Sequence, residues 1–302
     1  MSDMLVEFES VSVCYKKTLG IDQITFGLSS GTTLGLLGPN GAGKSTCLKA
    51  MAGLIRPTSG HVRTLNNEEF GVLPHFRQQI GYVPEDPWLY PWMTALQIVR
   101  FAAPMYERWD EELAEQLISD FDLPSDRPIR TLSKGTRVKA ALLVALAHRP
   151  RLLVMDEPLA GLDPLARDDM VSQIVRARSE GTECVVISSH QVDEIVRLAD
   201  QVAILNRGRM VVNAGINELQ SDAKRIEAVL IDGCLPKHEL RQTVWRHVNR
   251  REWSMTVYPF NESLVDELQR NNSLTSISVS DLGIEQIMKD VIRGDQQSCS
   301  VL

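Results

Sequence analysis

A glycine-rich turn between an apolar run and a helical stretch constrains this chain more than any other feature of its sequence. The run Thr33–Leu37 is compact and apolar, and a helical pattern continues through Met51. Between them stands Gly38-Pro39-Asn40-Gly41-Ala42-Gly43-Lys44-Ser45, which fits G-x-x-x-x-G-K-[ST]. Glycines in such a turn let backbone N–H groups point inward around an anion without Cβ clashes. The turn therefore indicates a phosphate-binding loop that follows a strand.

Two side chains of this loop carry its expected chemistry. Lys44 would reach the β- and γ-phosphates of a nucleotide, and the hydroxyl of Ser45 would bind Mg²⁺. The helix that follows adds its unpaired N-terminal N–H groups and its dipole to the same anion site. The alternative is a glycine-rich turn without a ligand, but the strand before the loop and the helix after it favour nucleotide binding.

A second apolar run ends in two acids. Leu152-Leu153-Val154-Met155-Asp156 has the pattern of a buried strand, and Glu157 follows directly. A carboxylate at the end of a buried strand beside a phosphate loop can hold Mg²⁺, so Asp156 is a candidate metal ligand. The neighbouring Glu157 can orient and deprotonate an attacking water, which makes it the candidate general base. Strands often end in solvated acids, so these two acids alone are weak evidence for a catalytic site. The phosphate loop in the same chain makes that interpretation much stronger.

Composition is that of an ordinary globular protein and argues against two other classes. The 302 residues are 43% hydrophobic and 24% charged, enough for one large domain and a small one. Acidic residues outnumber basic residues 39 to 32, and the net charge of −7 argues against a broad nucleic-acid surface. No apolar run approaches the roughly 18 to 20 residues of a membrane-spanning helix, and the five cysteines lack CxxC spacing. We therefore expect a cytoplasmic protein with reduced thiols.

Strand-like runs alternate with helical stretches through the first two thirds of the chain. Residues 87–149 are largely helical in pattern, and Asn206-Arg207-Gly208-Arg209 resembles a hairpin turn. The alternation predicts an α/β fold with a mostly parallel sheet and helices on both faces. Strands are expected at Leu5–Phe8, Val11–Tyr15, Ile24–Leu28, Thr33–Leu37, Leu152–Met155, Cys184–Ser188 and Val202–Leu205.

Gly215 marks the expected boundary between a domain of residues 1–215 and a second domain of residues 216–302. The second domain has the pattern of a small accessory α/β domain and carries no chemical motif. Its expected strands are Ala228–Ile231, Met255–Tyr258 and Ser276–Val279, and its expected helices are Lys237–His247, Glu262–Gln269 and Ile284–Ile292.

Further short segments occur in the order and spacing of one known family. Leu132-Ser133-Lys134-Gly135-Thr136 is similar to the signature of ABC ATPases, whose usual form is Leu-Ser-Gly-Gly-Gln. Tyr15 matches the aromatic residue that stacks on adenine, and residues 80–85 match the segment that leads into the Q-loop. Residues 159–164 match the D-loop, and His190 matches the switch histidine. The chain therefore resembles the ATP-binding subunits of ABC transporters.

The resemblance covers roughly residues 5–215. Taken singly, Tyr15 could be a core aromatic residue and His190 a structural one, but so many matches in the family's order make coincidence a poor explanation. The family's fold is a P-loop NTPase nucleotide-binding domain. It implies a mostly parallel core sheet, antiparallel N-terminal strands and a helical subdomain at about residues 87–149.

The resemblance also implies a mechanism. Family members dimerise head to tail, so Ser133 and the backbone of Gly135 would contact the γ-phosphate held by the other subunit. Glu157 would be the general base, His190 would position the γ-phosphate and the water, and Asp163 would link the two sites. The residues expected to bind ATP are Tyr15, Gly38, Pro39, Asn40, Gly41, Ala42, Gly43, Lys44, Ser45, Thr46, Ser133, Gly135 and Asp163, and those expected at Mg²⁺ are Ser45, Asp156 and Glu85.

Two segments depart from the usual family pattern. The Q-loop position is Glu85, where most relatives carry Gln, although a carboxylate still offers oxygen to Mg²⁺ or water. In the signature, Lys134 and Thr136 replace Gly and Gln, while Ser133 and Gly135 remain. We expect activity to survive these changes. Such variants resemble the motor subunits of the ABC-2 exporter group.

The sequence thus predicts an ATP-hydrolysing motor subunit of an ABC transporter, an exporter that works through a separate membrane permease. The expected partners are that permease and a second ATPase subunit, in a homodimer or a heterodimer, at the inner face of the cell membrane. No nucleic-acid partner is expected. The alternative is a non-transport ABC ATPase acting on nucleic acid or ribosomes, although the coiled coil, zinc-binding cysteines or fused second domain usual in that class are not found in the sequence. The transported substrate is set by the partner chain.

Overall fold

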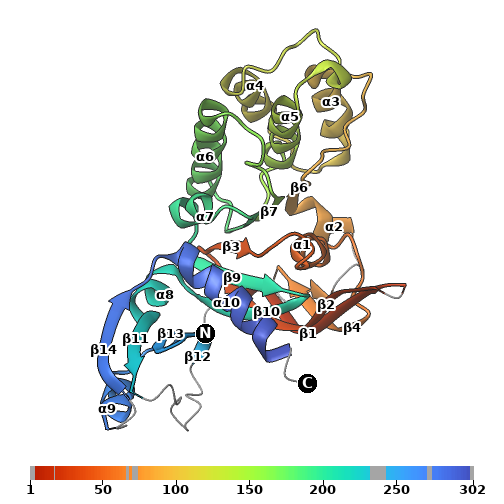
Figure 1. Ribbon diagram of the computed structural model, residues 1–302. Coiled ribbons are helices and arrows are strands. Elements are labelled where there is room, and N and C mark those ends of the chain that lie inside the picture. Colours follow the sequence, from red (N-terminus) through yellow and green to blue (C-terminus); the bar gives the residue numbers. More distant parts are fainter. Residues whose placement is uncertain are drawn as a thin grey trace. The chain divides into compact units, whose positions relative to one another are not determined.

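The computed structural model describes residues 4–16, 18–65, 68–69, 74–231, 243–270 and 274–299 (Figure 1). The chain divides into two compact units, Met1–Met210 and Val211–Leu302. The expected division into domains of residues 1–215 and 216–302 stays a prediction. Among the residues that the structure describes, no helix combines the length and the apolar character needed to cross a membrane.

The first sheet is antiparallel along β1 and its two neighbours, with strand order β2-β1-β4-β5. The runs expected separately at 5–8 and 11–15 belong to one strand. A register shift occurs between Phe8 and Val11, where Ser10 has a φ of 49°, and pairing with β2 resumes beyond it. The strands are β1 (Met4–Tyr15), β2 (Thr18–Ser29), β4 (Ser59–Thr64) and β5 (Glu68–Glu69).

The second sheet has the strand order β10-β9-β3-β8-β7-β6. The pairs β9–β3, β3–β8, β8–β7 and β7–β6 are all parallel, which confirms the predicted α/β core. Strands β3, β7 and β8 are buried along their whole length, as expected for parallel strands covered on both faces. The strands are β3 (Thr33–Leu37), β6 (Ile80–Val83), β7 (Leu152–Asp156), β8 (Cys184–Ser189), β9 (Gln201–Asn206) and β10 (Arg209–Gly215).

Helices cover both faces of the parallel sheet. Helix α1 (Lys44–Met51) shares one apolar core with the antiparallel sheet and with Leu34 and Leu36 of β3. Helix α7 (Val192–Leu198) covers the opposite face. Gly35, between Leu34 and Leu36 in β3, faces this helix, because successive residues of a strand face opposite sides of the sheet. A Cβ on Gly35 would lie 2.0 Å from the Ile195 side chain, so only glycine lets α7 approach β3 this closely.

Residues 87–149 are mostly helical, as predicted. Thr94 opens the first helix with a capping box, and Asp110 and Ser133 cap the next two by accepting bonds from Leu113 N–H and Thr136 N–H. The helices are α3 (Ala95–Ala102), α4 (Glu111–Asp120) and α5 (Lys134–Ala147), with short 3₁₀ turns at Ala103–Met105 and Ile129–Thr131. Outside this region the first unit also has α2 (Pro74–Gln78) and α6 (Pro164–Ser179).

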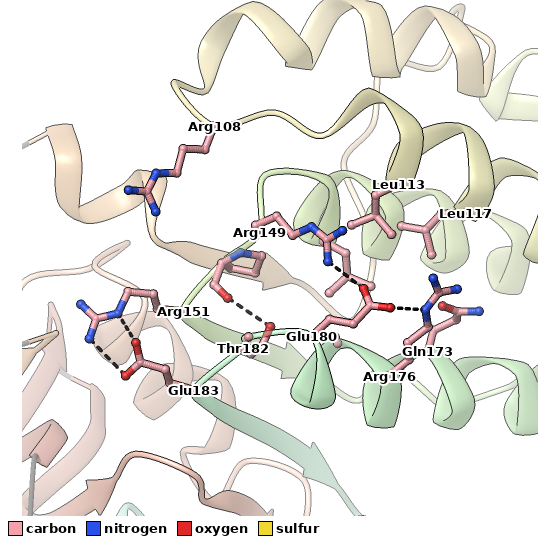
Figure 2. Close-up of a pocket in the computed structure, with 14 residues that line it drawn as sticks. Arg108, Leu113, Leu117, Arg149, Arg151, Gln173, Arg176, Glu180, Thr182 and Glu183 are labelled. Carbon is pink, nitrogen blue, oxygen red and sulfur yellow. Dashed lines mark hydrogen bonds and ion pairs between the residues drawn. The ribbon is translucent and has the colours of Figure 1, made fainter.

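One ion pair joins the end of α5 to the end of α6, and another joins the start of β7 to the start of β8 (Figure 2). Arg149 donates to Glu180 at 2.7 Å, and Arg151 donates to the Glu183 carboxylate at 2.5 and 3.1 Å. These residues and several apolar side chains line a cavity of about 430 Å³. The two helix ends are therefore tied to each other, and so are the two strand starts, around this cavity.

The second unit contains an antiparallel sheet with strand order β12-β13-β11-β14. The helix expected at 237–247 is wrong for residues 243–247, which belong to β12, and the remainder lies outside the described residues. The helices expected at 262–269 and 284–292 are confirmed. The elements are α8 (Ile216–Asp222), β11 (Lys224–Leu230), β12 (Thr243–Asn249), β13 (Glu252–Val257), α9 (Glu262–Gln269), β14 (Leu274–Asp281) and α10 (Ile284–Cys299).

A buried carboxylate attaches α10 to this sheet. Asp290 is fully buried and forms an ion pair with Arg225 of β11. Its carboxylate also accepts hydrogen bonds from the hydroxyl of Thr256 at 2.6 Å and the amide of Gln286 at 2.8 Å. Removing such a carboxylate would leave the guanidinium buried without its counter-charge.

We therefore expect Asp290→Ala to destabilise the second unit by about 3 kcal/mol or more, the usual result of breaking a buried ion pair. Asp281→Ala is the matched control, because Asp281 also pairs with a cation but its side chain is 86% exposed. Urea unfolding followed by tryptophan fluorescence would measure both. Equal unfolding curves for the two variants would contradict a stabilising role for Asp290.

Candidate active site

The loop between β3 and α1 depends on glycine for its shape. Gly41 and Gly43 have φ angles of 78° and 104°, in the region that favours glycine. A Cβ on Gly43 would lie 2.5 Å from the carbonyl oxygen of Gly20, so the loop and the start of β2 leave no room for a side chain. Gly43 is also the residue from which α1 begins. The loop therefore brings backbone amides to the N-terminus of a helix, where an anion is favoured.

Lys44 is the first residue of α1, directly after this loop, and is almost completely buried. Its ammonium donates to the carbonyl oxygens of Gly38 at 2.8 Å and Pro39 at 3.4 Å. The same Nζ lies 3.3 Å from Oε1 of Glu157. A buried ammonium needs such partners, and phosphate oxygens can replace them because they carry more negative charge than a carbonyl.

The two acids at the end of β7, Asp156 in the strand and Glu157 directly after it, are held by one hydroxyl of β8. Ser188 donates to Oδ1 of Asp156 at 2.8 Å, and it accepts a bond from the backbone N–H of Glu157 at 2.9 Å. Both acids are buried, and Glu157 has a φ of 48°, which is unusual for a residue with a side chain. Ser188 therefore fixes the sharp change of direction that turns the Glu157 carboxylate toward Lys44.

His190 completes this constellation. Its Nδ1 lies 2.8 Å from Oε2 of Glu157, and its backbone N–H donates to the same oxygen at 3.3 Å. The imidazole is half exposed, with 50% of its side-chain surface open. One oxygen of the Glu157 carboxylate is thus held by Lys44 and the other by His190, while the imidazole extends to the surface.

A cavity of about 540 Å³ gathers most of the residues predicted for the site. Three separate parts of the sequence reach it: the hairpin of β1 and β2, the loop before α1, and the ends of β6, β7 and β8. The predicted residues that line it are Tyr15, Pro39, Asn40, Gly41, Ala42, Gly43, Lys44, Ser45, Thr46, Glu85, Asp156, Glu157 and His190.

Four predicted residues, all of them described, do not line this cavity. Gly38 is the first residue of the loop, and its carbonyl accepts a hydrogen bond from Lys44. Ser133 and Asp163 cap α5 and α6, accepting from Thr136 N–H at 3.1 Å and Ala166 N–H at 2.9 Å. A Cβ on Gly135 would lie 2.7 Å from Leu162, which places the start of α5 against the segment before α6. The signature segment thus forms a second feature apart from the cavity.

The sequence alone did not identify every residue that forms the site. Thr18, Leu19, Gly20 and Ala160 also line the cavity, and Ser188 orients both acids. The hydroxyl run Ser188-Ser189 directly before His190 marks a polar strand end, but it does not show which hydroxyl orients the acids. The cavity-lining residues of β2 carried none, because only the folding of the hairpin brings them to the loop.

The electrostatic balance of the cavity is suited to a divalent cation. The described residues of its lining include three carboxylates, those of Glu85, Asp156 and Glu157, against the single ammonium of Lys44. The hydroxyl of Ser45 and the carboxylate of Asp156 are hard oxygen ligands of the kind that Mg²⁺ prefers. Within the described ranges, no three His, Cys, Asp or Glu side chains form a metal site by themselves. The residues therefore fit a cation that takes part of its ligands from a bound molecule.

Tyr82 lies near Asp156 at the neighbouring strand end. Burial raises the pKa of its phenol, and the carboxylate of Asp156 raises that pKa further. Both effects act in the same direction, so the Tyr82 hydroxyl stays protonated at neutral pH. It adds no charge near the carboxylate of Asp156.

The parallel sheet, the phosphate loop and the paired acids together define a P-loop nucleotide-binding protein. Residues 21–160 match the ABC transporter family. The chain is 31% identical to the Nod factor export ATP-binding protein I of Sinorhizobium fredii over 84% of its own length and 75% of the relative. The chain belongs to the family of ABC transporter ATP-binding proteins. The predicted family resemblance and P-loop NTPase fold are thereby confirmed.

Two further comparisons agree. An uncharacterised ABC transporter ATP-binding protein of Nostoc sp. is 32% identical over 68% of this chain, which spans 62% of that relative's length. A solved ATP-binding subunit of an ABC transporter has a TM-score of 0.65 and 29% identity, and the match covers 72% of this chain and 92% of that structure.

The position of Ser188 generates a prediction. We expect Ser188→Ala to lower the rate of the ATP hydrolysis predicted for this site by roughly tenfold, because a hydrogen bond to a charged group contributes about 1.5 kcal/mol or more and about 1.4 kcal/mol corresponds to a factor of ten. Ser189→Ala is the control, since that hydroxyl donates to Glu194 instead, at 2.7 Å. A steady-state phosphate-release assay would compare the variants. Equal rates for Ser188→Ala and the parent would remove Ser188 from the site.

Proposed function

We propose that this chain is the ATP-binding and ATP-hydrolysing motor subunit of an ABC transporter of the exporting kind. The observation that carries the proposal is the single cavity in which Tyr15, the phosphate loop, Asp156, Glu157 and His190 meet. A nucleoside triphosphate has matching parts: a base for the aromatic ring, phosphates for the loop, and a reacting γ-phosphate for the carboxylates and the imidazole.

Hydrolysis in this cavity needs little covalent chemistry from the protein. Glu157 accepts a proton from water, whose oxygen forms a bond to the γ-phosphorus as the bond to the β-phosphate oxygen breaks. Lys44 and the loop amides stabilise the charge on the phosphates. When Lys44 turns to the phosphates, Oε1 of Glu157 loses its 3.3 Å ion pair and becomes available as a base. His190 holds the other oxygen of the same carboxylate, which fixes its direction.

Ser45 and Asp156 would hold Mg²⁺, with Glu85 as a further oxygen ligand at the cavity wall. When bound, this ion neutralises phosphate charge and orients the γ-phosphate. Ser188 prepares the site by holding Asp156 at 2.8 Å.

A second ATPase subunit is part of the proposal. Ser133 and Gly135 do not line the cavity of their own chain, although the family signature is expected to contact a γ-phosphate. Head-to-tail pairing places the signature of one subunit over the cavity of the other, in a homodimer or a heterodimer. The amino end of α5, capped by Ser133, then points at an anion, as the helix dipole favours.

The permease is proposed as the partner of an exposed aromatic surface made of Trp88, Tyr90, Trp92 and Phe101. Their exposed fractions are 96%, 44%, 62% and 39%. The ring of Tyr90 lies 5.4 Å from that of Trp92 and 5.0 Å from that of Phe101, so these three rings form a continuous patch. Exposed aromatic clusters mark interaction sites. Binding here would keep the chain at the inner face of the cell membrane.

Export is favoured over the nucleic-acid and ribosome alternative by the departures at Glu85 and Lys134 and by the names of relatives. The Sinorhizobium fredii relative is named for export. The acidic balance of the whole chain also disfavours a nucleic-acid partner, because phosphate backbones select basic surfaces.

We further propose that residues 1–215 form the nucleotide-binding domain and 216–302 an accessory domain. Every described residue that lines the cavity lies before position 191. A chain that ends after Gly215 keeps β10 entire and is expected to bind ATP within about threefold of the full chain. Titration with a fluorescent ATP analogue would measure this, with circular dichroism as the check of folding. A folded truncation without affinity for ATP would show that the second domain completes the site.

The central test of the proposed function is Glu157→Gln. The amide is nearly isosteric, so ATP should still bind, but hydrolysis should fall by about 10²- to 10⁴-fold because the base is lost. Bound ATP then holds two subunits together, and the variant should accumulate as a dimer in Mg-ATP and return to monomer without nucleotide. Size-exclusion chromatography with light scattering reports both states.

Ser133→Arg in the same variant is the control for the head-to-tail arrangement. It should abolish the dimer while ATP binding to the subunit's own phosphate loop persists, because Ser133 lies outside that cavity. Hydrolysis by Glu157→Gln at the parent rate would exclude Glu157 as the base. An inactive variant that stays monomeric in ATP would contradict the homodimer and favour a different partner motor.

A further inference from the structure

The two departures from the usual family pattern lie beside one another in this chain. Nζ of Lys134, the first residue of α5, is 3.9 Å from Oε1 of Glu85 in the segment after β6. A second pair lies beside the first, in which Nη2 of Arg137, three residues after Lys134, is 3.7 Å from Oδ1 of Asp86. Two acids of one segment thus face two cations of one helical turn.

The start of α5 has an unusual charge. Its first turn carries Lys134 and no acidic residue, and Arg137 follows one turn later. Cations at a helix N-terminus add to the positive end of the dipole and are unfavourable there. Glu85 and Asp86 supply the missing negative charge from outside the helix. The two ion pairs therefore connect the segment after β6 to the start of α5, each through one acid and one cation.

The two ion pairs differ in whether their acid lines the nucleotide cavity. Glu85 lines the nucleotide cavity, whereas Asp86, which the structure also describes, does not. The Glu85 side chain is 57% exposed, so solvent weakens its charge, but an uncompensated carboxylate at this wall still repels the phosphates of a nucleotide. Among the described residues of the lining, Lys44 carries the one ammonium that balances the three carboxylates. Lys134 adds a positive charge from behind Glu85.

We propose that Lys134 is a positioning residue for Glu85: it holds this carboxylate at the cavity wall and offsets its charge, so that Glu85 can serve the nucleotide site. The inference rests on the proposed function, because it assumes that ATP occupies the cavity. It makes residues 85 and 134 a single unit, and the effect of changing one therefore depends on the identity of the other.

A double-mutant cycle tests this dependence. The variants are Lys134→Gln, Glu85→Gln and their combination, with Lys134→Arg as the conservative change. In the parent, which keeps Glu85, Lys134→Gln should weaken ATP binding by about three- to fivefold, the upper range for an exposed ion pair. Added to Glu85→Gln, the same change should have no effect beyond about 1.5-fold, because a neutral amide needs no counter-charge. Lys134→Arg should match the parent.

Arg137→Gln is the matched control. It removes one positive charge from the same end of α5, but its partner Asp86 does not line the cavity. We expect the ATP affinity of Arg137→Gln to stay within about 1.5-fold of the parent, although this variant loses the same charge from α5 as Lys134→Gln does. Affinity is measured with a fluorescent ATP analogue over a range of Mg²⁺ concentrations, and kcat and KM are measured alongside. The difference between Lys134→Gln and Arg137→Gln should shrink with added salt.

A loss of affinity that is the same with and without Glu85→Gln would overturn the proposal, since Lys134 would then act without Glu85. Parent-like affinity of Lys134→Gln would overturn it as well. Failure of the proposed function gives a different result, in which the parent itself does not bind ATP. In that case, coupling between positions 85 and 134 in nucleotide-free thermal unfolding decides whether the pair exists, and additive effects would reject it.

Discussion

The parallel register of three strands is the constraint on which the site depends. Leu37 of β3 pairs with Ser189 of β8, and Ser188 pairs in turn with Asp156 of β7. The three strands therefore end together, and neighbouring strands in a sheet lie about 4.8 Å apart. Residues that follow these ends must meet at one edge. A register shift of a single residue would also move every buried side chain of a strand to the other face, so packing of the core and alignment of the site are secured together.

This dependence explains why so much could be predicted from the sequence. Each functional group follows its strand directly, so a short apolar run and the next few residues contain both the structural and the chemical signal. The loop at 38–45 and the acids at 156 and 157 are of this kind, and the structure places the loop and both acids around the same cavity. Carboxyl ends of parallel strands meet at one edge by topology, without any need to know the loops between them.

The parts that could not be predicted depend on contacts between distant segments. Ser188 had the same local pattern as any polar strand end, and only its position opposite Asp156 makes it an orienting residue. Residues 243–247 could not be predicted as a strand, because they are the last five residues of segment 237–247, whose sequence pattern predicts a helix. Their pairing with β13 decides the conformation, which is a tertiary override of local preference. The contact between Glu85 and Lys134 likewise exists only after folding, since α3 and α4 separate them in sequence.

The partners of Lys44 have a thermodynamic consequence. Its ammonium already has two carbonyls and a carboxylate within reach, so its charge is satisfied before any phosphate arrives. Nucleotide binding is therefore an exchange of partners in which old contacts are given up as new ones form, and only the difference contributes to affinity. Such a site favours moderate rather than very tight binding. The same exchange that limits how tightly a nucleotide is held also returns partners to the lysine when the nucleotide leaves, so that neither state leaves a buried ammonium without a counter-charge.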